Sequence, residues 1–186
     1  MNRAIKRISA AFFTFLSGIT ALFGIFCSTA CTGSHHSEEL FFYRTETVEA
    51  NIVMECNGTS SSFHYKGNEE ACTVEFTAPN ELNGFILEVS SDSARVIYED
   101  LNTEAPEALC TIPNIVRRIF ALSPENVTEI TTAPHPQNEE ETVTVVTVSE
   151  ITVTLDQSGS PIIAEGTLFG TSFRAQIIDL AVIRQE

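Results

Sequence analysis

The chain has 186 residues, of which 43% are apolar, and its 25 acidic and 10 basic side chains give a formal net charge of −15. So acidic a chain repels nucleic acid and anionic lipid headgroups and favours basic partners. The composition therefore excludes nucleic-acid binding and leaves the classes of enzyme, binding protein and interaction protein open.

The first thirty residues have the order of an export signal. Arg3, Lys6 and Arg7 precede an uncharged, largely apolar run from Ile8 to Phe26, which is typical of a secretory signal. The run is also about as long as a short membrane-spanning helix, so a retained anchor is the alternative. In both cases the basic end stays in the cytoplasm.

Two cysteines follow the apolar run, and the second fits a lipid-attachment site. Small side chains, Ser28 to Ala30, stand directly before Cys31, whereas the bulky Phe26 precedes Cys27. The pattern resembles a bacterial lipobox, although serine replaces the usual leucine three residues before the cysteine. We expect residues 1–30 to be removed and Cys31 to be acylated, and more than one acyl chain gives stable anchoring. The alternative is an unmodified thiol behind an ordinary signal.

Residues 31–39 contain Gly, Ser and charge and are expected to form a short lipidated tether. His35 and His36 in this segment lack the third and fourth converging ligands of a metal site, so no metal is predicted. Without the first thirty residues the charge becomes −18, because that segment holds three basic and no acidic side chains. The remaining length suits one domain with its own core, placed at 40–186.

The exported part also holds Cys56, Cys72 and Cys110, an odd number that cannot all pair within one chain. Cys56 and Cys72 fall on apolar faces of strand patterns, and a disulfide between them requires neighbouring strands at the right spacing. Buried free thiols are the other interpretation. There is no CxxC spacing, so neither a redox motif nor a zinc site is predicted.

The first half of the domain alternates with the period of β-strands. From Val48 to Cys56, apolar residues alternate with mostly polar ones, which predicts a half-buried strand. The same alternation returns around Phe63 and Tyr65, from Cys72 to Phe76, from Phe85 to Val89, and around Val96 and Tyr98, with turn signals between the runs. Five consecutive strands predict an antiparallel meander.

The period then changes to that of a helix. Apolar residues recur at helical spacing between Pro113 and Leu122, with Arg117 and Arg118 on the other side. Proline suits the first turn of a helix, and the Ser123–Pro124 pair suits its end. One amphipathic helix of about ten residues is predicted. The paired arginines could hold a phosphate headgroup, but a solvated helix face is the simpler interpretation.

Five more strands follow, separated by a Pro- and Glu-rich loop at Ala133–Glu141 and a tight connection at Gln157–Gly159. They are predicted at Val127–Thr132, Thr142–Glu150, Ile151–Asp156, Ile162–Thr167 and Phe169–Ile178. A sheet of about ten strands must curl or split, and one principal helix cannot cover all of it. We expect a curved sheet with either an apolar hollow or a fully packed core.

A family resemblance rests on the order of these features. A Tyr43-containing segment precedes the first long strand, "FTAPNELNGFILEV" covers Phe76–Val89, the helix follows, and "LDQSGSPIIAEG" covers Leu155–Gly166. This order spans nearly all of residues 40–186 and resembles lipoproteins of the LolA/LolB-like superfamily. The resemblance implies a mainly β (α+β) fold: a single strongly curved antiparallel sheet, an unclosed half-barrel, with the principal helix against its concave face.

The resemblance also implies a function. Those proteins hold lipids or the acyl chains of lipoproteins, and similar germination-type lipoproteins of spore formers act as anchored partners. In this resemblance Pro79, Asp156, Gly159 and Pro161 are framework residues and not catalytic ones. The chain has no Trp, which the carriers often place in a central strand, and this departure argues against transfer of cargo between membranes.

The sequence thus predicts a non-catalytic, membrane-anchored extracytoplasmic lipoprotein that binds a lipid or an acylated partner. His64 and His135 have no nucleophile or carboxylate partner visible in the sequence, and no GxSxG or HExxH motif occurs, so neither an enzyme nor a cofactor is expected. The expected lining of the hollow is Phe76, Phe85, Leu87, Val89, Val96, Ile119 and Phe120. The alternative is an adaptor lipoprotein that supports a cell-wall or spore-germination enzyme and carries no lipid cargo.

Overall fold

Eleven antiparallel strands form one open sheet in the computed structural model, which describes residues 41–184 of the chain. The strands are β1 (Thr47–Cys56), β2 (Thr59–Gly67), β3 (Ala71–Ala78), β4 (Ile86–Ser90), β5 (Ala94–Tyr98), β6 (Leu101–Glu104), β7 (Val127–His135), β8 (Asn138–Val148), β9 (Ile151–Leu155), β10 (Pro161–Leu168) and β11 (Thr171–Ile183). Helix α2 (Thr111–Phe120) follows β6, and short 3-10 helices are η2 (Asn80–Leu82), η3 (Glu107–Cys110) and η4 (Pro124–Asn126).

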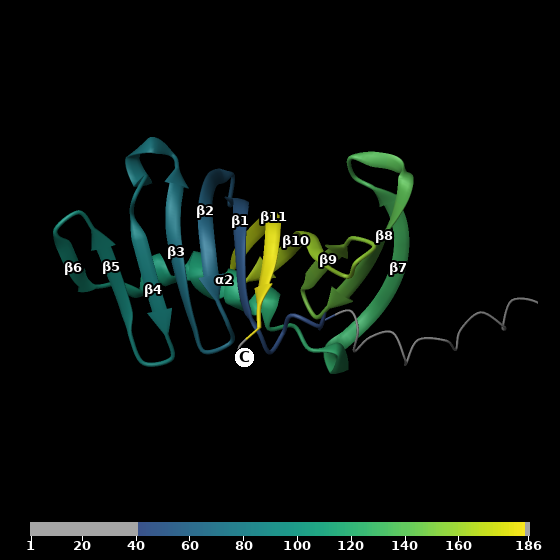
Figure 1. Cartoon of the computed structure of the whole chain (residues 1–186), viewed down its shortest axis with the longest axis horizontal. Coiled ribbons are helices and arrows are strands. Elements are labelled where there is room, and N and C mark those ends of the chain that lie inside the picture. The colour runs from purple at the N-terminus through teal and green to yellow at the C-terminus, as the bar shows by residue number, and fades with distance from the viewer. Residues whose placement is uncertain (1–40, 185–186) are drawn as a thin grey trace, which may run out of the picture. The chain divides into compact units, whose positions relative to one another are not determined.

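The strands lie in the order β6-β5-β4-β3-β2-β1-β11-β10-β9-β8-β7. Two meanders, β1 to β6 and β7 to β11, therefore join through the pairing of the first strand with the last. Figure 1 shows β1 and β11 side by side, with β6 and β7 at the two ends of the sheet. Because the end strands do not pair with each other, the sheet stays open. The expected mainly β fold, an unclosed half-barrel with one principal helix, is confirmed.

Alternation along the strands decides which face of the sheet is buried. On β1, Val48, Ala50, Ile52 and Met54 are all buried, whereas the residues between them point to the other face. Residues opposite one another in register share a face, so the pattern passes from strand to strand. The concave face is therefore apolar over most of its width.

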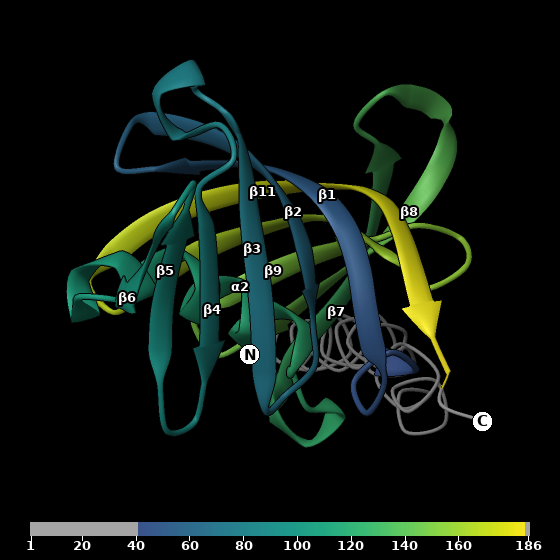
Figure 2. The same cartoon turned by 60° about the vertical axis from the view of Figure 1, so that its left-hand side comes forward.

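A bulge bends the sheet near its middle. Asn51 on β1 lies opposite Ile178 on β11, but Glu49 lies opposite Ala181, so β11 carries an extra residue there. Asp179, in this stretch, has a left-handed φ of 54°. An extra residue of this kind bends a strand and increases its twist, and Figure 2 shows β11 as a long arc.

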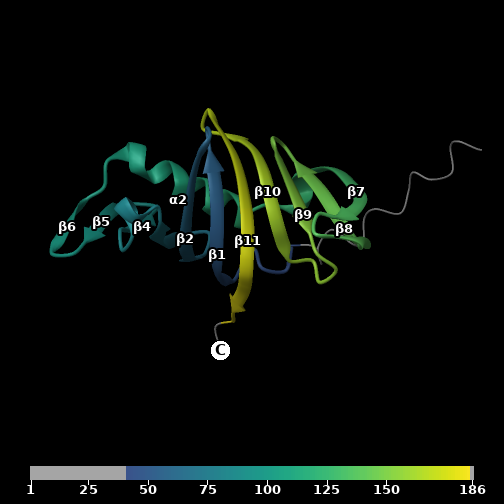
Figure 3. The ribbon, with the colours of Figure 1, turned by 90° about the horizontal axis from the view of Figure 1, so that it is seen from above.

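Helix α2 lies against the concave side of the sheet, as Figure 3 shows from above. It begins at Thr111, two residues before Pro113, so the proline stands in the first turn as predicted. Its buried apolar side chains are Pro113, Ile115, Val116, Ile119 and Phe120. The helix ends at Phe120, and the N–H of Ala121 then donates to the carbonyl oxygen of Arg117. Arg117 and Arg118 lie in the last turn, where positive charge complements the helix dipole.

Three strand predictions differ from the structure. No alternation predicts β6, because its four residues are all exposed. The loop expected at Ala133–Glu141 is mostly strand, since β7 runs to His135 and β8 begins at Asn138. The last strand begins at Thr171, because Phe169 adopts a φ of 53° in the turn before it. A phenylalanine rarely adopts this conformation, so it carried no turn signal.

Candidate functional site

The residues expected to line a hollow lie together in the interior, between helix α2 and one half of the concave face. Phe76 on β3, Leu87 and Val89 on β4, Val96 on β5, and Ile119 and Phe120 on α2 are buried, and Phe85 is partly buried beside them. They belong to one continuous apolar cluster that also includes residues of β1, β2 and the β8 to β11 strands. Side chains of the helix fill the space above the sheet, so the interior is a packed core in this structure. That these seven residues contact a ligand therefore remains a proposal, in which the ligand displaces the helix.

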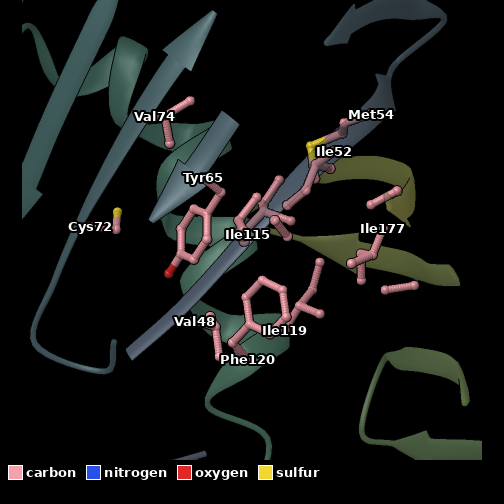
Figure 4. Packing of buried hydrophobic residues seen from close by; sticks show 14 of the residues in the cluster. Val48, Ile52, Met54, Tyr65, Cys72, Val74, Ile115, Ile119, Phe120 and Ile177 are labelled. Atoms are coloured by element: carbon pink, nitrogen blue, oxygen red, sulfur yellow. The ribbon is translucent and has the colours of Figure 1, made fainter. Parts of the chain in front are cut away.

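Phe120, the last residue of α2, is the centre of an aromatic group between the helix and the sheet. Its ring stacks on that of Tyr65, with centroids 5.3 Å apart, and meets the ring of Tyr43 edge-on at 5.9 Å. Figure 4 shows Tyr65 and Phe120 beside Ile115 and Ile119 of the helix. Geometries of this kind stabilise by about 0.5–1.5 kcal/mol beyond the buried area. The last turn of the helix is thus fixed by aromatic contacts to β2 and to the segment before β1.

Two hydroxyl groups in this interior have no hydrogen-bond partner among residues 41–184. The Oη atoms of Tyr43 and Tyr65 are both fully buried and unpaired. Burial raises the pKa of both tyrosines above the ordinary value. A buried hydroxyl without a partner costs about 1–3 kcal/mol. The interior therefore holds two polar groups that an oxygen atom of a ligand could satisfy.

The three cysteines in the described part of the chain are free. Cys56 ends β1 opposite Thr59, whereas Cys72 lies on β3 opposite Gly67 at the other end of β2. A whole strand separates the two thiols, so the possible Cys56–Cys72 disulfide does not form. Burial, the largest cause, raises the pKa of the Cys72 thiol to about 12. Such a thiol stays protonated and unreactive at neutral pH.

A group of polar side chains around His64 lies on the convex face and was not predicted from the sequence. The Nε2 atom of His64 lies 3.1 Å from Oε1 of Glu49, and its Nδ1 atom lies 3.2 Å from Oδ1 of Asn51. Lys66 adds a 3.5 Å contact to the same glutamate. The register places these residues opposite one another on β1 and β2, a signal that the strand alternation could have revealed. His64 thus has a carboxylate partner that the sequence did not reveal, but the two groups that its ring contacts include no hydroxyl or thiol, which a Ser-His-Asp or Cys-His arrangement requires.

His135 has a structural role in the turn between β7 and β8. Its Nδ1 atom accepts the N–H of Gln137 at 3.1 Å.

Within residues 41–184, no group of three or more His, Cys, Asp or Glu residues could hold a metal ion. No helix in the same range has the length and apolar character needed to span a membrane. Cys31, the predicted signal at 1–30 and the tether at 31–39 lie outside the described residues.

The hollows on the surface differ from the interior in polarity. One of about 480 Å³ lies over β3 and β4 and includes the charged residues Lys66, Glu88 and Arg95. Another of about 320 Å³ lies between the exposed side of α2 and the turn before β11, lined by Arg117, Arg118 and Phe169 among others. The first is an unsuitable place for an acyl chain, because charges line it. A third hollow, of about 350 Å³, lies beside β10 and β11 and is lined by Ile162, Ile163, Ile177 and Ile178 among polar residues. The interior is the larger apolar surface.

Comparison with known proteins gives a likeness of fold. No protein-family model matches the chain, and no curated protein matches it. Similar solved structures include the lipoprotein LppX of Mycobacterium tuberculosis, at 16% identity and a TM-score of 0.43, covering 78% of this chain and 91% of that one. A LolA superfamily protein of Nitrosomonas europaea has 10% identity and a TM-score of 0.41, covering 84% and 96%.

The MucA/MucB complex of Pseudomonas aeruginosa is a third similar structure, at 12% identity and a TM-score of 0.42. The match covers 82% of this chain and 59% of that one. One of these three structures is described as a LolA superfamily protein, the superfamily that the sequence resembles.

Proposed function

We propose that the protein is a non-catalytic extracytoplasmic lipoprotein, anchored through an acylated Cys31, that binds a lipid or an acylated partner on the concave face of the sheet, where helix α2 now lies. The observation that carries the proposal is the interior: one wide apolar face covered by a single helix of ten residues. In this proposal residues 1–30 are the signal, 31–39 the lipidated tether and 40–186 the binding domain.

The ligand of this proposal takes the place of the helix. Displacing α2 exposes four large apolar side chains, Ile115, Val116, Ile119 and Phe120, at about 1.5–3 kcal/mol each, or roughly 6–12 kcal/mol together. An acyl chain of about fourteen carbons recovers roughly 10 kcal/mol at about 0.8 kcal/mol per CH₂. The two terms are of the same size, so an acyl chain can compete with the helix for the concave face.

The unpaired hydroxyls of Tyr43 and Tyr65 support a ligand with a polar atom. A carbonyl, ester or carboxylate oxygen beside them would accept the hydrogen bonds that the closed interior leaves unmade. Each such bond contributes about 1 kcal/mol net. A plain hydrocarbon would leave both hydroxyls unsatisfied, so we expect fatty acids or acyl esters to bind more tightly than alkanes of equal length.

A fluorescent fatty acid and native mass spectrometry test the proposal on the full chain in a mild detergent. We expect the wild-type protein to retain lipid and to bind the probe. Ile119→Val should weaken the packing of the helix on the sheet by about 0.5–1.5 kcal/mol. Because the ligand competes with the helix, this loss should tighten probe binding by about 2- to 10-fold. The matched control, Ile52→Val, removes the same methylene from the sheet that both states need, so it should not tighten binding.

Hydrogen exchange supplies a second measurement. Bound fatty acid should speed exchange at the amides of α2 and leave the central strands β1 and β11 protected, because only the helix leaves its place. A protein that never retains lipid and does not bind the probe would show that the interior is only a packed core.

The anchor is tested separately by metabolic labelling with a palmitate analogue. Wild type and Cys27→Ala should be labelled, whereas Cys31→Ala should lose the label. Persistent label on the Cys31→Ala variant would rule out acylation at this position.

A further inference from the structure

Strand β7 is an edge of the sheet along its whole length. Among the described strands it pairs with β8 alone, and six of its nine residues are exposed while the other three are half-buried, so none is fully buried. β6, the edge at the opposite end, has only four residues. A long edge strand presents a row of unpaired N–H and C=O groups that can pair with another chain.

The apolar row that crosses the concave face ends unprotected on β7. Residues opposite one another in register form a row of seven: Ile130, Val146, Val153, Ala164, Ala175, Met54 and Ser61. Every member except the first is buried, while Ile130 remains 39% exposed. One more strand beside β7 would cover this isoleucine as the neighbouring strands cover the rest of the row.

The ladder fixes which main-chain groups of β7 point outward. The N–H of Thr167 on β10 donates to the carbonyl oxygen of Glu150, the residue directly before β9, at 3.3 Å, so these two residues form a hydrogen-bonded pair. Bonded and non-bonded pairs alternate along antiparallel strands. This alternation can be followed from β10 through the register of β9 and β8 to β7. Ile130 and Thr132 then fall in non-bonded pairs with β8, so their N–H groups point away from it. Pro134 follows the same alternation, and a proline on an edge strand suits an outward position because it has no N–H to lose.

The charge of this end of the sheet indicates the kind of partner. The sequence contains no Lys or Arg between Arg118 and Arg174. Glu129 on β7 and Glu140 and Glu141 on β8 are exposed, and neither strand contains Lys or Arg. A second copy of the chain would bring a second set of these glutamates to the same edge, which like-charge repulsion disfavours. A segment with Lys or Arg at alternate positions would instead meet complementary charge.

We infer that β7 binds an extended, basic segment of another protein as an additional strand of the sheet. Main-chain hydrogen bonds from Ile130 and Thr132 provide the attachment, Ile130 contributes apolar contact, and the glutamates select positive charge. This mode of recognition is strand addition to a sheet edge. It is independent of the proposed lipid site, since β7 lies at the end of the sheet beyond β8.

The test uses the full-length protein in detergent and a fluorescein-labelled peptide of sequence KTKVTVKTK as the probe. Thr132→Pro removes an outward N–H without removing a bond to β8, so we expect it to weaken binding at least tenfold in fluorescence polarisation. Thr132→Ala keeps the N–H and should bind within about twofold of wild type. The peptide ETEVTVETE should bind at least tenfold more weakly than the basic one. Bound basic peptide should also slow amide exchange at Ile130 and Thr132.

Three outcomes would overturn the inference. Absence of binding to the wild type, or equal binding by wild type and Thr132→Pro, would show that the edge is not the attachment site. A dimer that forms without peptide and is lost in Thr132→Pro, measured by light scattering after size-exclusion chromatography, would show that the edge pairs with a second copy.

Discussion

The ring of Phe120, the last residue of helix α2, stacks on the ring of Tyr65 on β2 at 5.3 Å, with an angle of 25° between the ring planes. This contact holds the helix to the sheet at the end where the chain turns back towards η4 and β7. The same ring touches Tyr43, which precedes β1. One side chain thus joins the helix to two parts of the first meander.

The first prediction concerns this ring. Phe120→Ala should lower the free energy of unfolding by about 3–5 kcal/mol, because it removes a fully packed aromatic side chain and leaves a cavity. Urea denaturation followed by circular dichroism measures the loss. Phe169→Ala is the matched control, since its ring is 70% exposed, and we expect a change within about 0.5 kcal/mol. Equal losses in the two variants would contradict the packing.

The second prediction separates the ring of Tyr65 from its hydroxyl. Tyr65→Phe keeps the stacked ring and removes a buried oxygen atom that has no partner. We expect stability to be unchanged or to rise by about 1 kcal/mol, because the desolvation cost of the hydroxyl disappears. Tyr98→Phe, at a partly exposed ring, should change little. A loss above about 1 kcal/mol in Tyr65→Phe would mean that the hydroxyl is hydrogen-bonded in solution.

Local sequence patterns predicted most of the strands and the helix, and the reason is visible on β1. Val48, Ala50, Ile52 and Met54 had to share a face whatever strand lay beside them, because the side-chain direction has a period of two. The helix was equally local: its apolar spacing and Pro113 define its face and its first turn. Features that depend on one strand and its own turns were therefore open to prediction.

Features that depend on distant segments were not. The pairing of β1 with β11 joins the two ends of the domain, and no local pattern specifies it. Of the residues expected to line a hollow, the four that lie on strands, Phe76, Leu87, Val89 and Val96, are buried, yet alternation cannot tell whether a ligand or the helix lies against them. In this structure the side chains of helix α2 pack against them.

The third prediction concerns Gly166 on β10. A Cβ atom at this position would overlap the carbonyl oxygen of Glu150, which already accepts the N–H of Thr167. Gly166→Ala should therefore destabilise by about 3 kcal/mol, as forced overpacking does. Gly58→Ala is the control: it meets open space and bears only the left-handed φ of 82°, so about 1 kcal/mol is expected. Thermal unfolding of both variants ranks them, and the reverse order would contradict the close approach.

The last prediction is a pH dependence that comes from Cys72. Burial raises the pKa of this thiol to about 12, against 9.0 for the unperturbed group, with Arg117 acting in the opposite direction. A group whose pKa is raised by folding stabilises the native state fully below its unfolded pKa, so stability should be complete below pH 9 and fall as the pH rises from 9 towards 12. The slope from one such group is about 1.4 kcal/mol per pH unit. Urea denaturation at pH 8, 9 and 10 measures it, and Cys72→Ala should make the fall shallower by about 1 kcal/mol per unit above pH 9. Because unfolding also exposes the buried tyrosines, some fall should remain in the variant, and an unchanged slope would show that the thiol already ionises in the folded protein.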